Sequence, residues 1–159
     1  MTRGPSVVLD ADVLIPILSC DFLLTCFDLG LFVPIITPKI LVEVQQNLLE
    51  NFPKIDPERL RLRANQIAAT LHLHVQLDRF ATDELLPINV KDRHVAMAAI
   101  GERAGVVTND KRLRRELASL DPPVQAWFLQ MFRVSALREK KFDSPTAFFE
   151  RFTTAPPIT

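Results

Sequence analysis

Short apolar runs alternate with longer amphipathic stretches along most of the chain. The run Val7–Leu9 is apolar, β-branched in part, and stops at an aspartate, which predicts a strand buried on both faces. Leu31–Ile36, Gly105–Thr108 and Val124–Trp127 favour further strands, although Pro34 weakens the first of these. The sequence therefore predicts several short strands that are far apart along the chain.

The stretches between these runs carry apolar residues at helical spacing. We expect helices over Asp21–Gly30, from Thr37-Pro38 to about Glu50, and over Pro57–Leu73, Asp92–Ala104 and Lys111–Leu120. Thr37 has the N-cap preference and Pro38 suits the first helical position. Gly30 supplies a stop for the first helix, and Pro122-Pro123 ends the last.

Strands that alternate with helices indicate an α/β fold, here a three-layer α/β/α sandwich with a mainly parallel central sheet. With 159 residues, of which 48% are hydrophobic, the chain can bury a core of its own. We expect this domain to span residues 1–126. Phenylalanines gather after Trp127, so we expect residues 127–159 to form a helical C-terminal extension packed on the domain.

The composition narrows the classes of function. Lys and Arg number 19 together, as do Asp and Glu, so the chain is not a polycation that binds nucleic acid by bulk charge. Cys20 and Cys26 fit no metal-ligand or redox spacing, and we expect two reduced thiols. We find no signal peptide and no apolar run of about 18 residues, so we expect a cytoplasmic protein without membrane contact.

Four acidic residues lie where an α/β fold places its ligands. Asp10 and Asp110 each follow a predicted strand directly. Asp92 opens a helix, and Glu43 lies one turn into another. Because ligands bind outside the carboxyl ends of parallel strands, these side chains are expected to converge there. Each residue alone is more simply explained as a turn, cap or solvated helix position, so the hypothesis depends on all four together.

Clustered carboxylates repel one another and raise each other's pKa, and a divalent cation relieves that repulsion. Oxygen ligands select Mg²⁺ or Mn²⁺. Such an ion lowers the pKa of a bound water and stabilises a leaving oxygen, so the natural substrate is a phosphodiester. The pattern therefore predicts a metal-dependent hydrolase.

The segments VVLDADVL, TPKILVEVQQNLL, DRHVAMAAI and VVTND resemble, in order and spacing, those of the PIN-domain nucleases, including the VapC-like toxins of type II toxin–antitoxin pairs. The resemblance covers roughly residues 6–128. It implies a PIN-like fold and a metal-dependent endoribonuclease that hydrolyses RNA by a metal-activated water. It also implies that Asp10, Glu43, Asp92 and Asp110 are catalytic and bind Mg²⁺ or Mn²⁺. The implied partners are an RNA substrate and an antitoxin protein, and the extension after Trp127 suits an antitoxin helix or a homodimer contact.

Several other side chains are candidates for supporting roles. Asp12, two residues along the strand from Asp10, is expected to point the same way and contact the metal site. Asn47 shares a helix face with Glu43 and is expected either to orient it or to lie in water. Asp12, Asn47 and Thr108 are therefore candidates for contacting and orienting the metal ligands without binding the metal directly. His94 is expected to bond a neighbouring backbone group or to contact RNA.

The densest basic patch follows Asp110 directly and is a candidate for binding RNA phosphates, or else a solvated helix face. It consists of Lys111, Arg112, Arg114 and Arg115.

Two other classes of function stay open. Val8–Leu14 also resembles the nucleophile motif of haloacid-dehalogenase-type phosphatases, in which Asp10 would attack phosphorus and Asp12 would act as acid and base. No acidic Gly-Asp pair closes such a site downstream. A non-catalytic protein- or RNA-binding module would need the acidic residues to be scattered.

Overall fold

A short parallel sheet lies at the centre of the fold. The computed structural model describes residues 5–71 and 87–129. Its strands are β1 (Ser6–Leu9), β2 (Val33–Ile35), β3 (Gly105–Val107) and β4 (Ala126–Trp127). Its helices are α1 (Ala11–Leu14), α2 (Ile17–Asp28), α3 (Pro38–Asn51), α4 (Pro57–Leu71), the 3-10 helix η2 (Val90–Asp92), α5 (Arg93–Glu102) and α6 (Lys111–Ala118).

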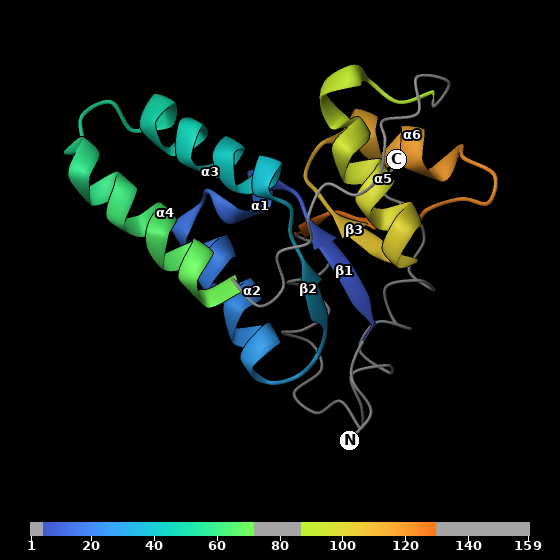
Figure 1. Ribbon diagram of the computed structural model, residues 1–159, viewed down its shortest axis with the longest axis horizontal. Coiled ribbons are helices and arrows are strands. Elements are labelled where there is room, and N and C mark those ends of the chain that lie inside the picture. Colours follow the sequence, from blue (N-terminus) through green and yellow to red (C-terminus); the bar gives the residue numbers. More distant parts are fainter. Residues whose placement is uncertain (1–4, 72–86, 130–159) are drawn as a thin grey trace.

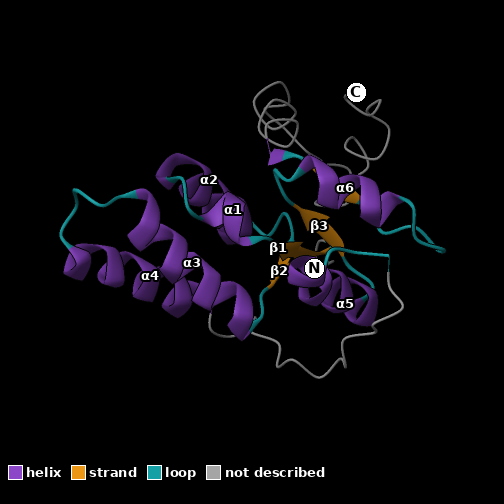
Figure 2. Cartoon of the chain, turned by 90° about the horizontal axis from the view of Figure 1, so that it is seen from above, coloured by secondary structure: helices purple, strands orange, loops and turns teal. Residues whose placement is uncertain are grey.

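The strand order is β2-β1-β3-β4, and all three pairings between the described strands are parallel. Figure 2 shows α5 and α6 on opposite sides of the sheet. Helices α3 and α4 pack against each other and extend to one side of it (Figure 1). The α/β class and the parallel sheet between two helical layers, expected from the sequence, are confirmed.

The core follows from the apolar runs. Val7, Val8 and Leu9 of β1 are fully buried, as expected for a strand with neighbours on both sides and helices on both faces. Pro34 is tolerated in β2 because that strand pairs with β1 alone among the described strands, so the missing N–H interrupts no second ladder.

Local capping signals fixed two helix ends as predicted. Thr37 caps α3 by accepting a hydrogen bond on Oγ1 from the N–H of Ile40, at 3.2 Å. Gly30 follows the end of α2 with a φ of +73°, a conformation that residues with a side chain rarely adopt. Helix α2 begins at Ile17, four residues earlier than expected, because Pro16 can precede a helix without a side-chain cap.

Three further expectations need correction or fall outside the described chain. Asp12 does not extend a strand, because the chain turns into α1 directly after Asp10. Asp92 ends η2, and α5 begins only at Arg93. The expected boundary at residue 126 falls inside β4, while the last residues of the Pro57–Leu73 helix and residues 130–159 of the C-terminal extension lie outside the described residues.

None of the helices in the described ranges has the length and apolar character needed to cross a membrane.

Candidate functional site

The acidic site lies at the carboxyl edge of the sheet, where β1 and β3 end side by side. Asp10 follows β1, is only 7% exposed, and accepts hydrogen bonds on both carboxylate oxygens. The N–H of Ala11 donates to Oδ1 at 2.8 Å, and the hydroxyl of Thr108 donates to Oδ2 at 2.7 Å. Burial raises the pKa of Asp10 in spite of these two bonds, and the carboxylate of Glu43 raises it further. Asp10 is therefore a rigidly held carboxylate with a reduced tendency to ionise.

Thr108 connects three acidic residues through one hydroxyl group. Besides donating to Asp10, its Oγ1 accepts the backbone N–H of Asp110 at 3.1 Å and lies 3.3 Å from Oδ2 of Asp12. A hydroxyl has one proton, and the shorter distance assigns it to Asp10. Thr108 is fully buried, so it fixes the ends of β1 and β3 relative to each other.

Asp12 reaches the same cluster from the first turn of α1. The backbone N–H of Asn109 donates to its carboxylate, at 3.1 Å to Oδ2 and 3.3 Å to Oδ1. Burial, followed by repulsion from Asp10, raises the pKa of Asp12 from 3.8 to about 7. The expected proximity of Asp12 to Asp10 is thus present, although a helical turn produces it and a strand does not.

Asp110 has two functions at once. It is the N-cap of α6, where Oδ1 accepts the N–H of Leu113 at 3.1 Å. Its charge also raises the pKa of Asp92 and of Asp12. Among the described residues nothing donates to Oδ2 of Asp110, so this oxygen has capacity for another ligand.

Asp92 occupies the N-cap position of α5, yet its side chain makes no capping hydrogen bond. Its φ of −104° and ψ of −2° differ from the extended conformation of a capping residue. Burial raises the pKa of its carboxyl group, and repulsion from Asp10, Asp110 and Glu43 raises it further, whereas Lys91 lowers it. The carboxylate of Asp92 is therefore repelled by three others and makes no capping bond to α5.

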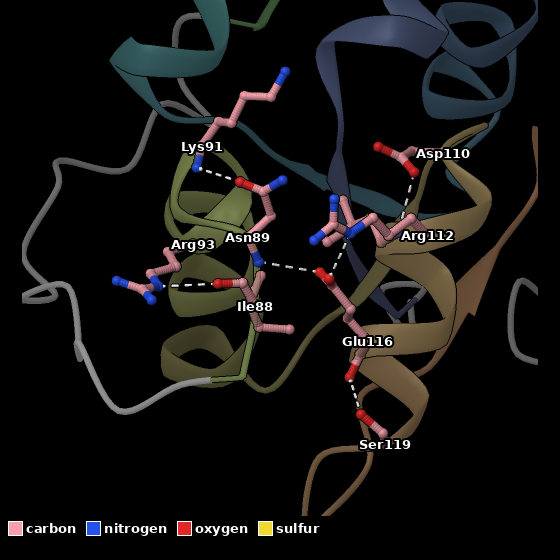
Figure 3. Close-up of polar contacts among 9 residues, drawn as sticks. Ile88, Asn89, Lys91, Arg93, Asp110, Arg112, Glu116 and Ser119 are labelled. Carbon is pink, nitrogen blue, oxygen red and sulfur yellow. Dashed lines mark hydrogen bonds and ion pairs between the residues drawn. The ribbon is translucent and has the colours of Figure 1, made fainter.

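A polar network positions the segment that carries Asp92 (Figure 3). Glu116 of α6 accepts the backbone N–H of Asn89 on Oε2 at 3.2 Å and the Nε–H of Arg112 on Oε1 at 3.0 Å. Asn89 in turn caps η2 by accepting the N–H of Lys91. Because Asp110 is the N-cap of the same helix, the bond from Asn89 to Glu116 links the segment that carries Asp92 to the helix that Asp110 caps. Sequence reasoning missed Glu116, since its partner Asn89 is 27 positions away.

Glu43 and His94 form a pair between α3 and α5. Nε2 of His94 lies 2.9 Å from Oε1 of Glu43, and the side chains are 5% and 30% exposed, respectively. His94 was expected to bond a backbone group or RNA, and the residue that it contacts is a carboxylate. The two residues are 51 positions apart, so no local spacing could have linked them. The residue Asn47 is half-buried, and its side chain makes no hydrogen bond to Glu43 or to any other described residue.

The basic residues of α6 differ in their surroundings. Arg114 donates from a terminal nitrogen to the carbonyl of Thr108 at 3.0 Å, and its guanidinium lies 5.0 Å from the ring centre of Phe128. Burial lowers the pKa of Arg114, although Asp12 and Asp110 attract its charge. Arg112 is paired with Glu116, while Lys111 and Arg115 are exposed. Of this patch, Arg114 is the cation held at the acidic edge.

The carboxylate oxygens of these acidic residues are the donor atoms that a hard divalent cation prefers. In this structure, however, the side chains are not close enough together to form a complete set of metal ligands. Within residues 5–71 and 87–129, no three side chains of His, Cys, Asp or Glu are arranged to hold a metal ion. Burial is the main cause of the raised pKa values of Asp10, Asp12 and Asp92, and repulsion between carboxylates adds to it. That repulsion opposes a closer approach of bare carboxylates. A cation would reverse the sign of that interaction.

Comparisons with models of protein families and with curated proteins find no match for this chain. The resemblance to PIN-domain nucleases therefore stays a hypothesis that depends on the motifs and on the site geometry.

Proposed function

We propose that the chain is a Mg²⁺- or Mn²⁺-dependent endoribonuclease with its active site at the carboxyl edge of the sheet. The observation that carries the proposal is the environment of Asp92. Its carboxylate is repelled by Asp10, Asp110 and Glu43, which come from three separate parts of the chain, and it makes no capping bond. A fold keeps such an arrangement at a cost to its stability, and a bound cation offsets that cost.

The residues that would hold the cation are Asp10, Glu43, Asp92 and Asp110. When bound, it lowers the pKa of a water and stabilises charge on the phosphate oxygens. The chain itself fixes the ligands: Thr108 and the N–H of Ala11 hold Asp10, and the first turn of α6 holds Asp110. Thr108 and Asp12 would be neighbours of these ligands and would not bind the cation themselves. Thr108 donates a hydrogen bond to Asp10, and Asp12 accepts one from the N–H of Asn109.

An RNA phosphodiester is the proposed substrate. A chain without net charge must hold a polyanion by local cations, and those nearest an acidic site matter most. Arg114 is suited to this function because Thr108 and Phe128 fix its position and no carboxylate within ion-pair distance neutralises it among the described residues. Lys111 and Arg115 would add longer-range attraction, whereas Arg112 serves Glu116.

The biological setting that fits such a nuclease, on the motif resemblance alone, is a cytoplasmic toxin regulated by an antitoxin, active as a monomer or a homodimer. Expression of the wild-type chain should then arrest growth, and expression of Asp92→Asn should not. Normal growth with the wild type, in cells that contain the folded protein, would contradict the toxin assignment while leaving the nuclease assignment to be judged by cleavage.

The direct test is cleavage of RNA by the purified chain with Mn²⁺ and with EDTA. Asp92→Asn is the most informative variant, because no capping bond is lost with the charge. We expect cleavage with Mn²⁺, none with EDTA, and none by Asp92→Asn, which should fold at least as stably as the wild type. Asp28→Asn removes the same charge from an exposed position in α2 and should cleave normally. Equal cleavage in EDTA, or by Asp92→Asn, would contradict the proposal.

A phosphatase is the second candidate, favoured by one observation. The pKa of Asp12, raised to about 7, suits a general acid and base near neutral pH. Against it, the proposed nucleophile Asp10 is buried, and both its oxygens accept hydrogen bonds. Hydrolysis of p-nitrophenyl phosphate without cleavage of RNA would establish this alternative.

A further inference from the structure

The pair of Glu43 and His94 joins two parts of the molecule. Glu43 lies on α3, which packs with α4 beside the sheet, whereas His94 lies on α5, which packs against β1 (Figure 1). Among the described side chains, theirs is the one hydrogen bond between α3 and α5. His94 also follows Asp92 by two residues. His94 of α5 therefore contacts the acidic residue Glu43 of α3, and a second acidic residue, Asp92, lies at the start of α5.

The proton of His94 is assigned by its surroundings. Nδ1 is buried and has no hydrogen-bond partner among the described residues. A proton on Nδ1 would leave a buried donor unsatisfied and would direct the lone pair of Nε2 at a carboxylate oxygen. A proton on Nε2 removes the repulsion between its lone pair and the carboxylate, and Nε2–H then donates to Oε1 of Glu43 over 2.9 Å.

The two partners differ in freedom of movement. The His94 ring is 5% exposed and is held by packing, whereas the Glu43 side chain is 30% exposed. A partly exposed glutamate otherwise samples several rotamers, and ordering it costs free energy. The bond to His94 fixes Oε1, and nothing in the described part of the chain donates to Oε2. That second oxygen is the one left for another ligand.

We propose that His94 is a positioning residue that orients Glu43, holding Oε1 by the Nε2–H so that Oε2 is presented to a divalent cation bound with Asp10 and Asp92. This inference depends on the proposed metal centre and assigns His94 no contact with the substrate. Hydrogen bonds behind a metal ligand orient it and tune its affinity, and removing them typically weakens metal binding by about 10–100-fold.

The test is calorimetric titration of the full chain with Mn²⁺ alone. His94→Ala should weaken Mn²⁺ binding by about 10–100-fold. His94→Gln keeps an N–H donor near the position of Nε2 and should recover most of the affinity. Val95→Ala is the matched control, since it opens a cavity in the same helix at a fully buried position and removes no polar group. It should lower the melting temperature and leave the Kd for Mn²⁺ unchanged.

A double-mutant cycle separates positioning from general loosening of the fold. In a Glu43→Ala background, His94→Ala should have no further effect on the Kd, because the carboxylate that it orients is gone. Three results would overturn the role of His94: wild-type affinity in His94→Ala, no recovery in His94→Gln, or an equal loss in the Glu43→Ala background. Failure of the wild type to bind Mn²⁺ would instead overturn the metal centre itself, and with it this role.

Discussion

Asp12→Asn removes one negative charge from the acidic cluster while keeping the shape of the side chain. With the amide oxygen at the position of Oδ2, the side chain can still accept the N–H of Asn109. We therefore expect the substitution to leave the fold intact and to change mainly the electrostatic free energy. The perturbation isolates the cost of charge at this position.

The size of that cost follows from the pKa of Asp12, which is raised from 3.8 to about 7. Between these values the folded protein binds a proton that the unfolded chain has released, so stability without metal falls as the pH rises through this window. The difference, 7 − 3.8, at about 1.4 kcal/mol for each pH unit, gives an upper limit of about 4 kcal/mol above pH 7. Asp12 keeps some contact with solvent, which screens part of this, and we expect about 2 kcal/mol.

Urea unfolding in EDTA, followed by the fluorescence of Trp127, measures this effect, because Trp127 is the one tryptophan of the chain and is buried in β4. The wild type should lose stability between about pH 4 and about pH 7, and Asp12→Asn should be the more stable protein above this range. Asp28→Asn, at an exposed position, should follow the wild type. An Asp12→Asn variant that is less stable than the wild type at about pH 8 would refute the reasoning.

Three further substitutions test other parts of the structure. Gly105→Ala would place a Cβ about 2.7 Å from Cη2 of Trp127, a rigid ring, so urea unfolding should show a loss of about 1–3 kcal/mol; wild-type stability would mean that the ring can move aside. Thr108→Val removes the buried hydroxyl that joins the strand ends and should cost about 1–3 kcal/mol, whereas Thr108→Ser should cost much less; equal losses would show that the methyl group matters and the hydroxyl does not. Arg114→Gln should reduce the salt slope of RNA binding by about 1, while Arg61→Gln in α4 should leave it unchanged; an unchanged slope in both would exclude a phosphate contact at Arg114.

The parts of the fold that the sequence predicted well depend on local signals. The run Val7–Leu9, the Thr37-Pro38 cap and the positive-φ Gly30 each act within a few residues, so a pattern reports them directly. The predicted parallel sheet followed from the alternation of such elements. Since strand ends in a parallel sheet share an edge, the nearness of Asp10 and Thr108 also followed from topology.

The parts that it predicted poorly depend on long-range contacts. Asp12 was expected to point the same way as Asp10 because residues two apart along a strand share a face, and only the structure shows α1 beginning at Ala11. The partner of His94 is a glutamate on another helix, and Glu116 binds a backbone N–H across 27 positions. Neither contact produces a repeating pattern in the sequence, because each of these side chains, taken alone, is typical of an ordinary helix position.

The hydrogen bond from Thr108 to Asp10 joins residues that are 98 positions apart, and this separation has a consequence during synthesis. A ribosome adds roughly 5–20 residues per second, so about 5–20 s pass between the two residues. During that interval β1 lacks its neighbour β3, and Asp92 and Asp110 have not yet joined Asp10. The acidic edge is thus incomplete in a growing chain until β3 has been made, and in any fragment that stops before β3.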